Sequence, residues 1–165
     1  MRRILLILMA MAVWSRSAGA CSRVNAVPAV DDLVARADAI VVATAVRYEI
    51  QPAPPGNGLI EFQVEEILAG HSQPVVRVDG GLVARDDFND KNPPYTFVRP
   101  NGRSGSCFAY DYREGARFLL LLKQSRDGSL TPYWEALAPT NEQLRGLDDP
   151  WLAIVRKLAT ASARR

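Results

Sequence analysis

The feature that most constrains the fold of this 165-residue chain is the position of its two cysteines, Cys21 and Cys107. Cys21 directly follows a segment with the parts of an export signal: two arginines after Met1, an apolar run over residues 4–14, and the small residues 18–20 of a cleavage site. Cleavage there makes Cys21 the first residue of the mature protein. We therefore expect residues 1–20 to be a signal peptide and residues 21–165 to be one secreted or periplasmic domain.

Two other interpretations of this segment stay open. A lipoprotein signal also places a cysteine directly after the cut, but such signals favour Leu three residues before it, where this chain has Ala18. The second interpretation is an uncleaved membrane anchor, although the apolar run is well short of the roughly 20 residues that span a bilayer. We expect contact with a membrane only if Cys21 carries a lipid.

The two cysteines predict one disulfide bond, because an even pair in an oxidising compartment is usually bridged. With the partners this far apart in the chain, a bridge between Cys21 and Cys107 stabilises the folded state by about 4–5 kcal/mol in the chain-entropy description. The alternative is two free thiols. A bridge would fix the mature N-terminus to the middle of the chain.

Composition excludes some partners and cofactors. Three of the twenty Lys and Arg residues lie in residues 1–20, which leaves 17 basic against 18 acidic residues in the mature chain. Such a balance provides no long-range attraction to nucleic acid. The chain has one histidine and no C-x-x-C pair, so we expect neither a metal nor another cofactor.

The hydrophobic pattern predicts a mainly β domain. We expect a short helix over residues 28–37, strands over 39–48, 59–68, 75–78, 117–123 and 130–137, and a C-terminal helix over about 149–160. Asp149 and Pro150 suit the start of that last helix, and Pro132 makes its strand an edge strand. The short connections favour a small five-stranded antiparallel barrel of the OB type.

A long polar segment, residues 79–106, interrupts this pattern. An ordered domain rarely has a loop of this length unless the loop binds a partner, packs as a lid or is mobile. Six aromatic residues lie in it or soon after it, and they either form a ligand face or close one end of the barrel over its core: Phe88, Tyr95, Phe97, Phe108, Tyr110 and Tyr112.

Three segments resemble the netrin modules and the tissue inhibitors of metalloproteinases, which use an OB-type barrel. The sequence ADAIVVATA at residues 37–45 is similar to the family's ADAVFVGRV strand. FQVEEILAG at residues 62–70 is similar to its F-x-V-x-x-V-x-K-G strand, and residues 106–122 are similar to its segment beginning Ser-Cys. Together with the cysteine at the mature N-terminus, the resemblance covers most of residues 21–123.

The resemblance implies a specific chemistry for the N-terminus. In the inhibitors of this family, the free amine and the carbonyl of the N-terminal cysteine chelate the zinc of a metalloprotease. Cys21 would take this role here, and Ser22 would enter the specificity pocket of the protease. The chain departs from the inhibitors at Arg23, where they have a further cysteine, at Asn25, where they usually have Pro, and at Phe108, where they commonly have Gly.

We therefore expect a secreted, non-catalytic module that binds another protein. Its expected contact edge consists of Cys21, Ser22, Arg23, Tyr95 and Phe97. The alternatives are a metalloprotease inhibitor that acts through the Cys21 amine, and a lipid-anchored envelope protein. An enzyme is not expected, because no base, nucleophile and oxyanion site occur together.

Two smaller patterns have simple interpretations. His71 lies between two expected strands and is expected to be a solvated turn residue rather than half of a Cys–His catalytic pair. Asp86, Asp87, Asn89 and Asp90 have the oxygen ligands that calcium prefers, but their spacing misses the calcium-loop pattern. We expect them to be solvated loop residues.

Overall fold

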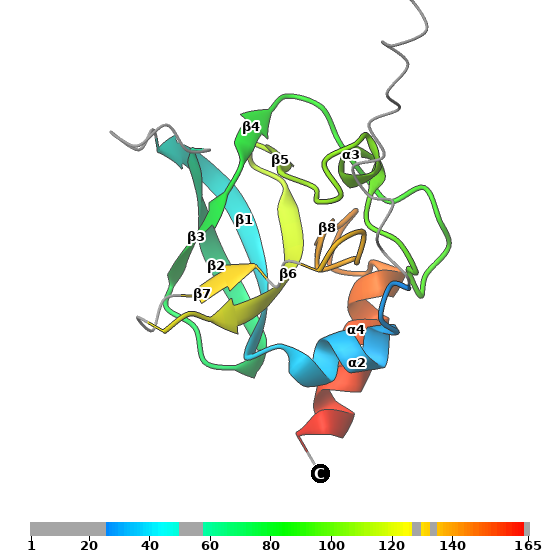
Figure 1. Ribbon diagram of the computed structural model, residues 1–165. Helices are drawn as coiled ribbons and strands as arrows, with labels where there is room; N and C mark the ends of the chain where they lie inside the picture. The colour runs from blue at the N-terminus through cyan, green and yellow to red at the C-terminus, as the bar shows by residue number, and fades with distance from the viewer. Residues whose placement is uncertain (1–25, 50–57, 127–129, 133–134, 164–165) are drawn as a thin grey trace, which may run out of the picture.

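The computed structural model describes residues 26–49, 58–126, 130–132 and 135–163. Within them the fold is mainly β, with helices at one end of a curved antiparallel sheet (Figure 1). The strand order is β3-β2-β1-β6-β7, and β8 also pairs with β6. The strands of this sheet are β1 (Ala39–Glu49), β2 (Leu59–Gly70), β3 (Val75–Asp79), β6 (Arg117–Gln124), β7 (Leu130–Pro132) and β8 (Asn141–Gln143).

The centre of the sheet is covered on both faces. β1 pairs with β6 in regular antiparallel register from Ala39 opposite Leu122 to Thr44 opposite Arg117. Ile40 and Val42 of β1 face one hydrophobic cluster, whereas its odd-numbered residues from 39 to 45 face another. This arrangement explains the continuous apolar sequence of the first part of β1, because residues 39–43 are buried on both faces of the strand.

The first cluster lies between the sheet and two helices, α2 (Val30–Arg36) and α4 (Pro150–Ser162), which pack side by side in Figure 1. Leu33 of α2 and Trp151 of α4 are both fully buried in it. The Asp149 side chain accepts a hydrogen bond from the Trp151 backbone N–H at 2.8 Å, which confirms the predicted N-cap of α4. The helices therefore close this face of the sheet.

The second cluster fills the concave side of the sheet. Phe62 of β2, Phe118 of β6 and Tyr112 of β5 meet edge to face, with ring centroids 5.1–5.7 Å apart. β5 (Asp111–Arg113) pairs in parallel with β4 (Gly81–Val83), and the two form a separate small sheet. A short helix, α3 (Pro100–Arg103), lies in the connection between these two strands.

Most of the expected elements are confirmed, and two expectations need correction. The strand expected over 130–137 ends at Pro132 in the described residues: 133 and 134 lie outside them, and 135–137 form no strand. The expected five-stranded barrel is not confirmed, because the described sheet has six strands and is not closed. β7 does lie at the edge of the sheet, as Pro132 predicts.

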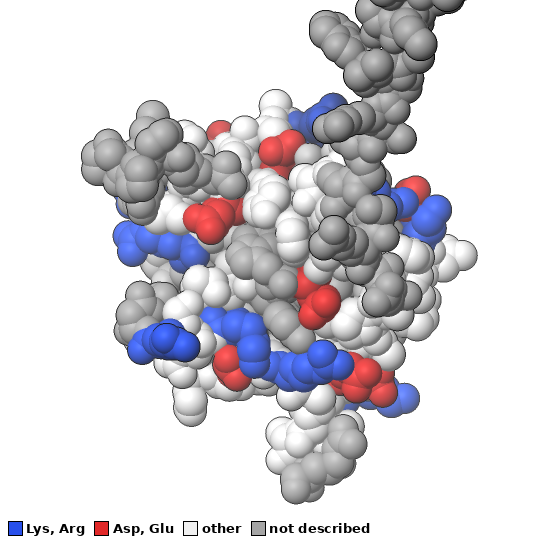
Figure 2. All heavy atoms as spheres, viewed as in Figure 1, with Lys and Arg blue, Asp and Glu red and all other residues white. Residues whose placement is uncertain are grey.

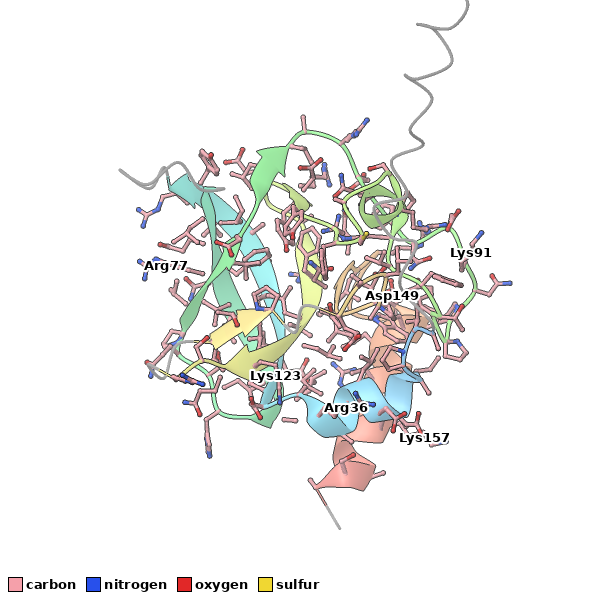
Figure 3. The ribbon with its side chains drawn as sticks, in the orientation of Figure 1. Arg36, Arg77, Lys91, Lys123, Asp149 and Lys157 are labelled. Atoms are coloured by element: carbon pink, nitrogen blue, oxygen red, sulfur yellow. The ribbon has the colours of Figure 1, made fainter. Side chains whose placement is uncertain are left out.

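Charged side chains on the visible face alternate in sign rather than gathering in one field (Figure 2). Several charged side chains are ion-paired between elements, among them Arg117 of β6 with Glu65 of β2 at 2.6 Å. Lys123 of β6 lies beside α2 (Figure 3), and its Nζ is 3.2 Å from the Asp38 carboxylate. No helix in the described part of the chain has the length and apolar character needed to cross a bilayer.

Candidate functional site

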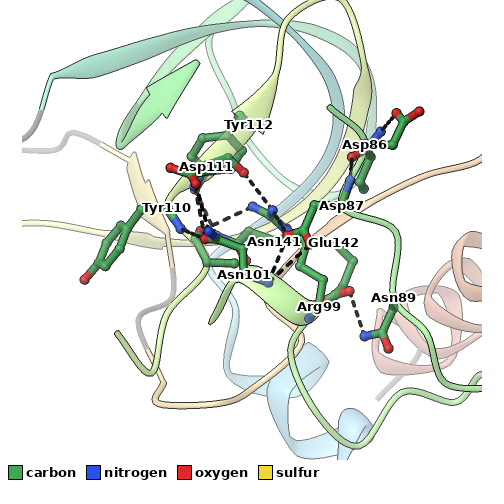
Figure 4. Close-up of polar contacts among 12 residues, drawn as sticks. Asp86, Asp87, Asn89, Arg99, Asn101, Tyr110, Asp111, Tyr112, Asn141 and Glu142 are labelled. Carbon is green, nitrogen blue, oxygen red and sulfur yellow. Dashed lines mark hydrogen bonds and ion pairs between the residues drawn. The ribbon is translucent and has the colours of Figure 1, made fainter. Parts of the chain in front are cut away.

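The long polar segment of the sequence is ordered and built around buried polar side chains. Most of it belongs to the β4–β5 connection, residues 84–110, which runs from the end of β4 to the start of β5 and contains α3. The short strand β8 lies next to it and supplies three buried polar residues, Asn141, Glu142 and Gln143. Figure 4 shows how these two segments are joined.

Arg99 is the centre of this arrangement. Its side chain is fully buried, and its guanidinium lies 5.1 Å from the centre of the Tyr112 ring. Nε donates to the backbone carbonyl of Asn141 at 2.9 Å, and one terminal nitrogen donates to Asp87 Oδ2 at 2.5 Å. The terminal nitrogens also donate to the carbonyls of Asp111 at 2.7 Å and Ala109 at 3.3 Å. A buried guanidinium requires such a set of acceptors, because an unpaired buried charge is strongly destabilising.

Two asparagines extend the network. Asn101 Oδ1 accepts hydrogen bonds from the backbone N–H groups of Tyr110 and Asp111, and its Nδ2 donates to the Asp111 carboxylate at 2.8 Å. Asn141 Nδ2 donates to the Tyr112 hydroxyl and to the Ala109 carbonyl, each at 2.8 Å. Burial raises the pKa of Tyr112 well above its usual range. These contacts fix the end of the connection against β5 and β8.

Glu142 fixes the first half of the connection. Its carboxylate is fully buried and accepts the Arg99 backbone N–H at Oε1 and Asn89 Nδ2 at Oε2, both at 2.9 Å. The same Asn89 Nδ2 donates to the Phe97 carbonyl at 2.8 Å. Burial raises the pKa of Glu142 to about 7, although Arg99 and the two N–H donors oppose the shift.

A hollow of about 590 Å³ lies on the outer side of the connection. Arg145 forms part of its wall, with the guanidinium 4.5 Å from the centre of the Phe88 ring. The carboxylates of the hollow have partners within the protein: Asp86 pairs with Arg113, Asp87 with Arg99, and Asp90 with Arg103. The lining residues are Val83, Arg85, Asp86, Asp87, Phe88, Asn89, Asp90, Pro100, Asn101, Ser104, Asp111 and Arg145.

The two aromatic residues of the expected contact edge have different environments. Tyr95 is buried and packs on Trp151 with ring centroids 4.8 Å apart, so its ring belongs to the first hydrophobic cluster. Phe97 is 43% exposed and is accessible to a partner. Lys91 lies at the outer rim of the same connection (Figure 3). The accessible part of the connection therefore combines one large apolar side chain with charged residues.

Cys21, Ser22 and Arg23 lie outside the described residues, so the expected contacts of the N-terminus and the Cys21–Cys107 bridge stay predictions. Cys107 itself is 7% exposed and has a positive φ of 66°. Among the residues that the structure describes, no cysteine is free. The Cys107 carbonyl accepts the Leu137 N–H at 2.7 Å, and the Leu137 carbonyl accepts the Val98 N–H at 2.7 Å. Leu137 thus links Cys107 to Val98 within the β4–β5 connection.

The smaller sequence patterns also have defined positions. His71 is exposed in the turn between β2 and β3, where the sequence placed it. The residues 86, 87, 89 and 90 are more than solvated loop residues, because their side chains bond to Arg113, Arg99, Glu142 and Arg103. No group of three metal-ligating side chains occurs in the described parts of the chain.

Arg99, Asn141, Glu142 and Gln143 were not singled out by the sequence. Asn141–Gln143 is a strand of three polar residues, and such a run has neither the alternation nor the β-branched composition of an ordinary strand. Arg99 follows Val98 and precedes Pro100 in a segment with no regular period. One feature of the sequence could have indicated a buried polar network here: many charged and amide side chains occur in a segment that also contains many aromatic residues.

Comparison with known proteins adds no family assignment. No protein-family model matches the sequence, and the search of curated proteins finds no match.

Proposed function

We propose that the protein is an exported, non-catalytic binding module whose contact surface is the outer side of the β4–β5 connection. The observation that carries the proposal is the Arg99 network, which holds 27 residues without a strand in a fixed conformation while leaving Phe97 and the hollow accessible. Ordered loops on a rigid scaffold are the usual location of binding residues in such domains. Another protein is the proposed partner.

The proposal that the module is not an enzyme rests on the burial and the hydrogen-bond partners of its ionisable side chains. Glu142 has the raised pKa of a general base, but its carboxylate is fully buried and both oxygens accept hydrogen bonds from the protein. Arg99 donates to the Asp87 carboxylate and to the Asp111 carbonyl, and the Asp111 carboxylate accepts from the Asn101 side chain. A catalytic group must reach a substrate atom: Glu142 and Arg99 are fully buried, and Asp87, which lines the hollow, is already paired with Arg99.

The strand order supports an OB-type barrel as the underlying architecture. β1 lies between β2 and β6, and the edge strands β3 and β7 of the order β3-β2-β1-β6-β7 come close to each other. Bringing these two edges together would give a partly open five-stranded barrel, the form that OB folds have. This is the architecture that the resemblance to netrin modules and metalloproteinase inhibitors implies.

Metalloprotease inhibition is the second candidate, and the position of Cys107 favours it. A bridge requires the Cα atoms of Cys21 and Cys107 to lie within about 4.4–6.8 Å. The mature N-terminus would then lie beside the β4–β5 connection, so that Cys21, Ser22 and Arg23 extend the same contact surface. Inhibition requires a free Cys21 amine, and acetylation of that amine would abolish it.

The proposal can be tested with a photo-crosslinking amino acid at position 97. The matched control position is 67, because Ile67 on β2 is similarly exposed, at 47% against 43% for Phe97. We expect discrete adducts with one other protein from position 97 and none from position 67, in cells that produce the protein. Equal adduct patterns from the two positions would contradict a contact surface on the connection.

The intact mass of the protein from its native compartment tests the alternatives. An unmodified chain beginning at Cys21 that gains about two hydrogens on reduction supports export and the bridge. A panel of zinc proteases then tests inhibition. A mass that includes acyl chains on Cys21 would instead identify a lipid-anchored protein, with neither the bridge nor the chelating amine.

A further inference from the structure

The hollow beside the β4–β5 connection is lined by two arginines that have no carboxylate partner among the described residues, Arg85 and Arg145. Arg85 is exposed, and its side chain makes neither a hydrogen bond nor an ion pair with the described part of the chain. The Arg145 guanidinium lies 4.5 Å from the centre of the Phe88 ring and donates to the Asn89 carbonyl at 3.2 Å. A guanidinium has several N–H donors, so both arginines retain donors for a ligand.

Most carboxylates of the hollow do not neutralise these two arginines, because they have cations of their own. Asp111 is the exception: it accepts the Asn101 side-chain amide at 2.8 Å and has no cation among the residues that the structure describes. The buried carboxylate of Glu142 does not line the hollow. The other three aspartates are paired, Asp86 with Arg113, Asp87 with Arg99, and Asp90 with both Arg103 and Lys91.

The one carboxylate without a cation lies apart from the two arginines. Asp86 directly follows Arg85 in the chain, and the Asn89 carbonyl bonds to Arg145. Figure 4 shows Asp86 and Asn89 on one side of the network and Asp111 on the other. The charge that a ligand meets beside Arg85 and Arg145 is therefore positive.

Arg145 also has the geometry to bind a carboxylate and not only to attract one. The Phe88 ring covers one face of the guanidinium, whereas the N–H donors lie in its plane, where a carboxylate can accept two of them. The volume of the hollow, about 590 Å³, is enough for an acidic side chain. Phe97 is close to this position, because its carbonyl accepts Asn89 Nδ2 at 2.8 Å. A partner that covers Phe97 would thus also reach the hollow.

We propose that the hollow binds an Asp or Glu side chain from an acidic segment of the partner protein, through the guanidiniums of Arg145 and Arg85. Phe97 contacts an apolar residue of the same segment. This inference rests on the proposed binding function, and it names the chemistry of the partner. Residues 21–165 are nearly balanced in charge, with 17 basic against 18 acidic residues. The preference for an acidic segment therefore comes from the hollow and not from the charge of the whole domain.

A short acidic peptide tests the chemistry of the hollow directly. Tetraglutamate is added to the isotopically labelled protein at low salt, because salt screens exposed charges. We expect saturable shifts of the amide NMR signals of Phe88 and Asn89, and no shift for Leu121 of β6. The neutral control peptide, tetraglutamine, should shift none of them. Equal shifts with the two peptides, or no shift with tetraglutamate at about 10 mM, would overturn the proposal.

Inorganic phosphate separates an acidic segment from a free anion. Phosphate is a compact anion that two arginines can also bind. Shifts at Phe88 and Asn89 with phosphate but none with tetraglutamate would overturn the proposal of an acidic protein segment. Shifts with tetraglutamate that excess phosphate does not abolish would support it.

Matched variants identify the residues that bind the peptide. Arg145→Gln and Arg85→Gln should each raise the dissociation constant for tetraglutamate about three- to fivefold, the effect of one exposed charge pair. Lys157→Gln is the control, because it removes one exposed positive charge from α4, away from the connection (Figure 3), and it should bind as the unaltered protein does. If Arg145→Gln does not fold, Arg85→Gln decides, because Arg85 has no described side-chain partner. An unchanged dissociation constant in Arg85→Gln would overturn the assignment.

Photo-crosslinking at position 97 separates this inference from the proposed function. Arg85→Glu should lose the adduct that the unaltered protein forms, and Lys157→Glu, which changes the net charge equally, should keep it. An adduct that survives Arg85→Glu would overturn the acidic partner while leaving the contact surface in place. No adduct in the unaltered protein would contradict the proposed function, and the peptide titration would still decide whether the hollow binds a carboxylate.

Discussion

Arg99→Met is the substitution that most severely tests the role of the buried network. Methionine fills a similar length of side chain but has no donors. The change removes the Arg99 donors that reach the carbonyls of Asp111 and Asn141 at 2.7 and 2.9 Å, and it leaves Asp87 without its cation. The Ala109 carbonyl loses the Arg99 donor but keeps that of Asn141. Each loss occurs around a residue that is fully buried.

The expected loss of stability can be estimated from these contacts. Breaking a buried ion pair by removing one partner costs about 3–5 kcal/mol, and each buried polar group left unsatisfied costs about 1–3 kcal/mol. Water can reach Asp87, whose side chain is 14% exposed, so the costs do not all add. We expect a decrease of about 3–5 kcal/mol in the free energy of unfolding, a large share of the roughly 5–15 kcal/mol of an ordinary domain.

Urea denaturation followed by circular dichroism measures this decrease. The matched control is Arg113→Met on β5, because Arg113 is 44% exposed and pairs with Asp86 at 3.2 Å. An exposed pair contributes about 0–1 kcal/mol, so the control should remain close to the unaltered protein. A loss below about 1 kcal/mol for Arg99→Met, or equal losses for the two variants, would refute the central role of Arg99.

Three further predictions follow from single contacts. Gly102→Ala places a Cβ 2.9 Å from the Ala109 backbone nitrogen and 2.7 Å from Val98 Cγ1, and it should lower the melting temperature. Gly81→Ala, where the new Cβ has no close contact, should leave the melting temperature unchanged. Asp149→Ala removes the acceptor of the Trp151 N–H and should cost about 1–2 kcal/mol in urea denaturation, compared with little change for the exposed Asp148→Ala. The free energy of unfolding should fall by up to about 3 kcal/mol between about pH 4.5 and pH 7, because the folded state binds the Glu142 proton more tightly than the unfolded state. Urea titrations that show rising stability across this range would contradict that last prediction.

The elements that sequence could predict are those whose pattern reflects burial. β1 and β6 are continuous apolar runs because both of their faces are covered, and α4 begins where Asp149 and Pro150 provide a cap and a first helical residue. β8 could not be predicted in the same way. Its residues Asn141, Glu142 and Gln143 are buried through hydrogen bonds rather than through apolar packing.

The candidate site, too, could be predicted from the sequence only in part. The sequence indicated a long segment that binds, packs as a lid or is mobile, and predicted both Tyr95 and Phe97 as contact residues. Phe97 is exposed, but Tyr95 is not. Tyr95 is buried because Trp151, 56 positions further along the chain, provides a ring for it to pack on. Arg99 and Glu142 were missed for a similar reason, because their partners come from β5, β8 and the far end of the connection.

The measurement that tests the account most directly is the yield of photo-crosslinked adduct at position 97, compared between the unaltered protein and Arg99→Met. Position 67 serves as the reference in both proteins. If Arg99 holds the contact surface in place, position 97 gives a discrete adduct that is lost in Arg99→Met, under conditions in which the variant remains folded by circular dichroism, and position 67 gives none. An adduct at position 97 that is unaffected by Arg99→Met would contradict a contact surface held in place by Arg99.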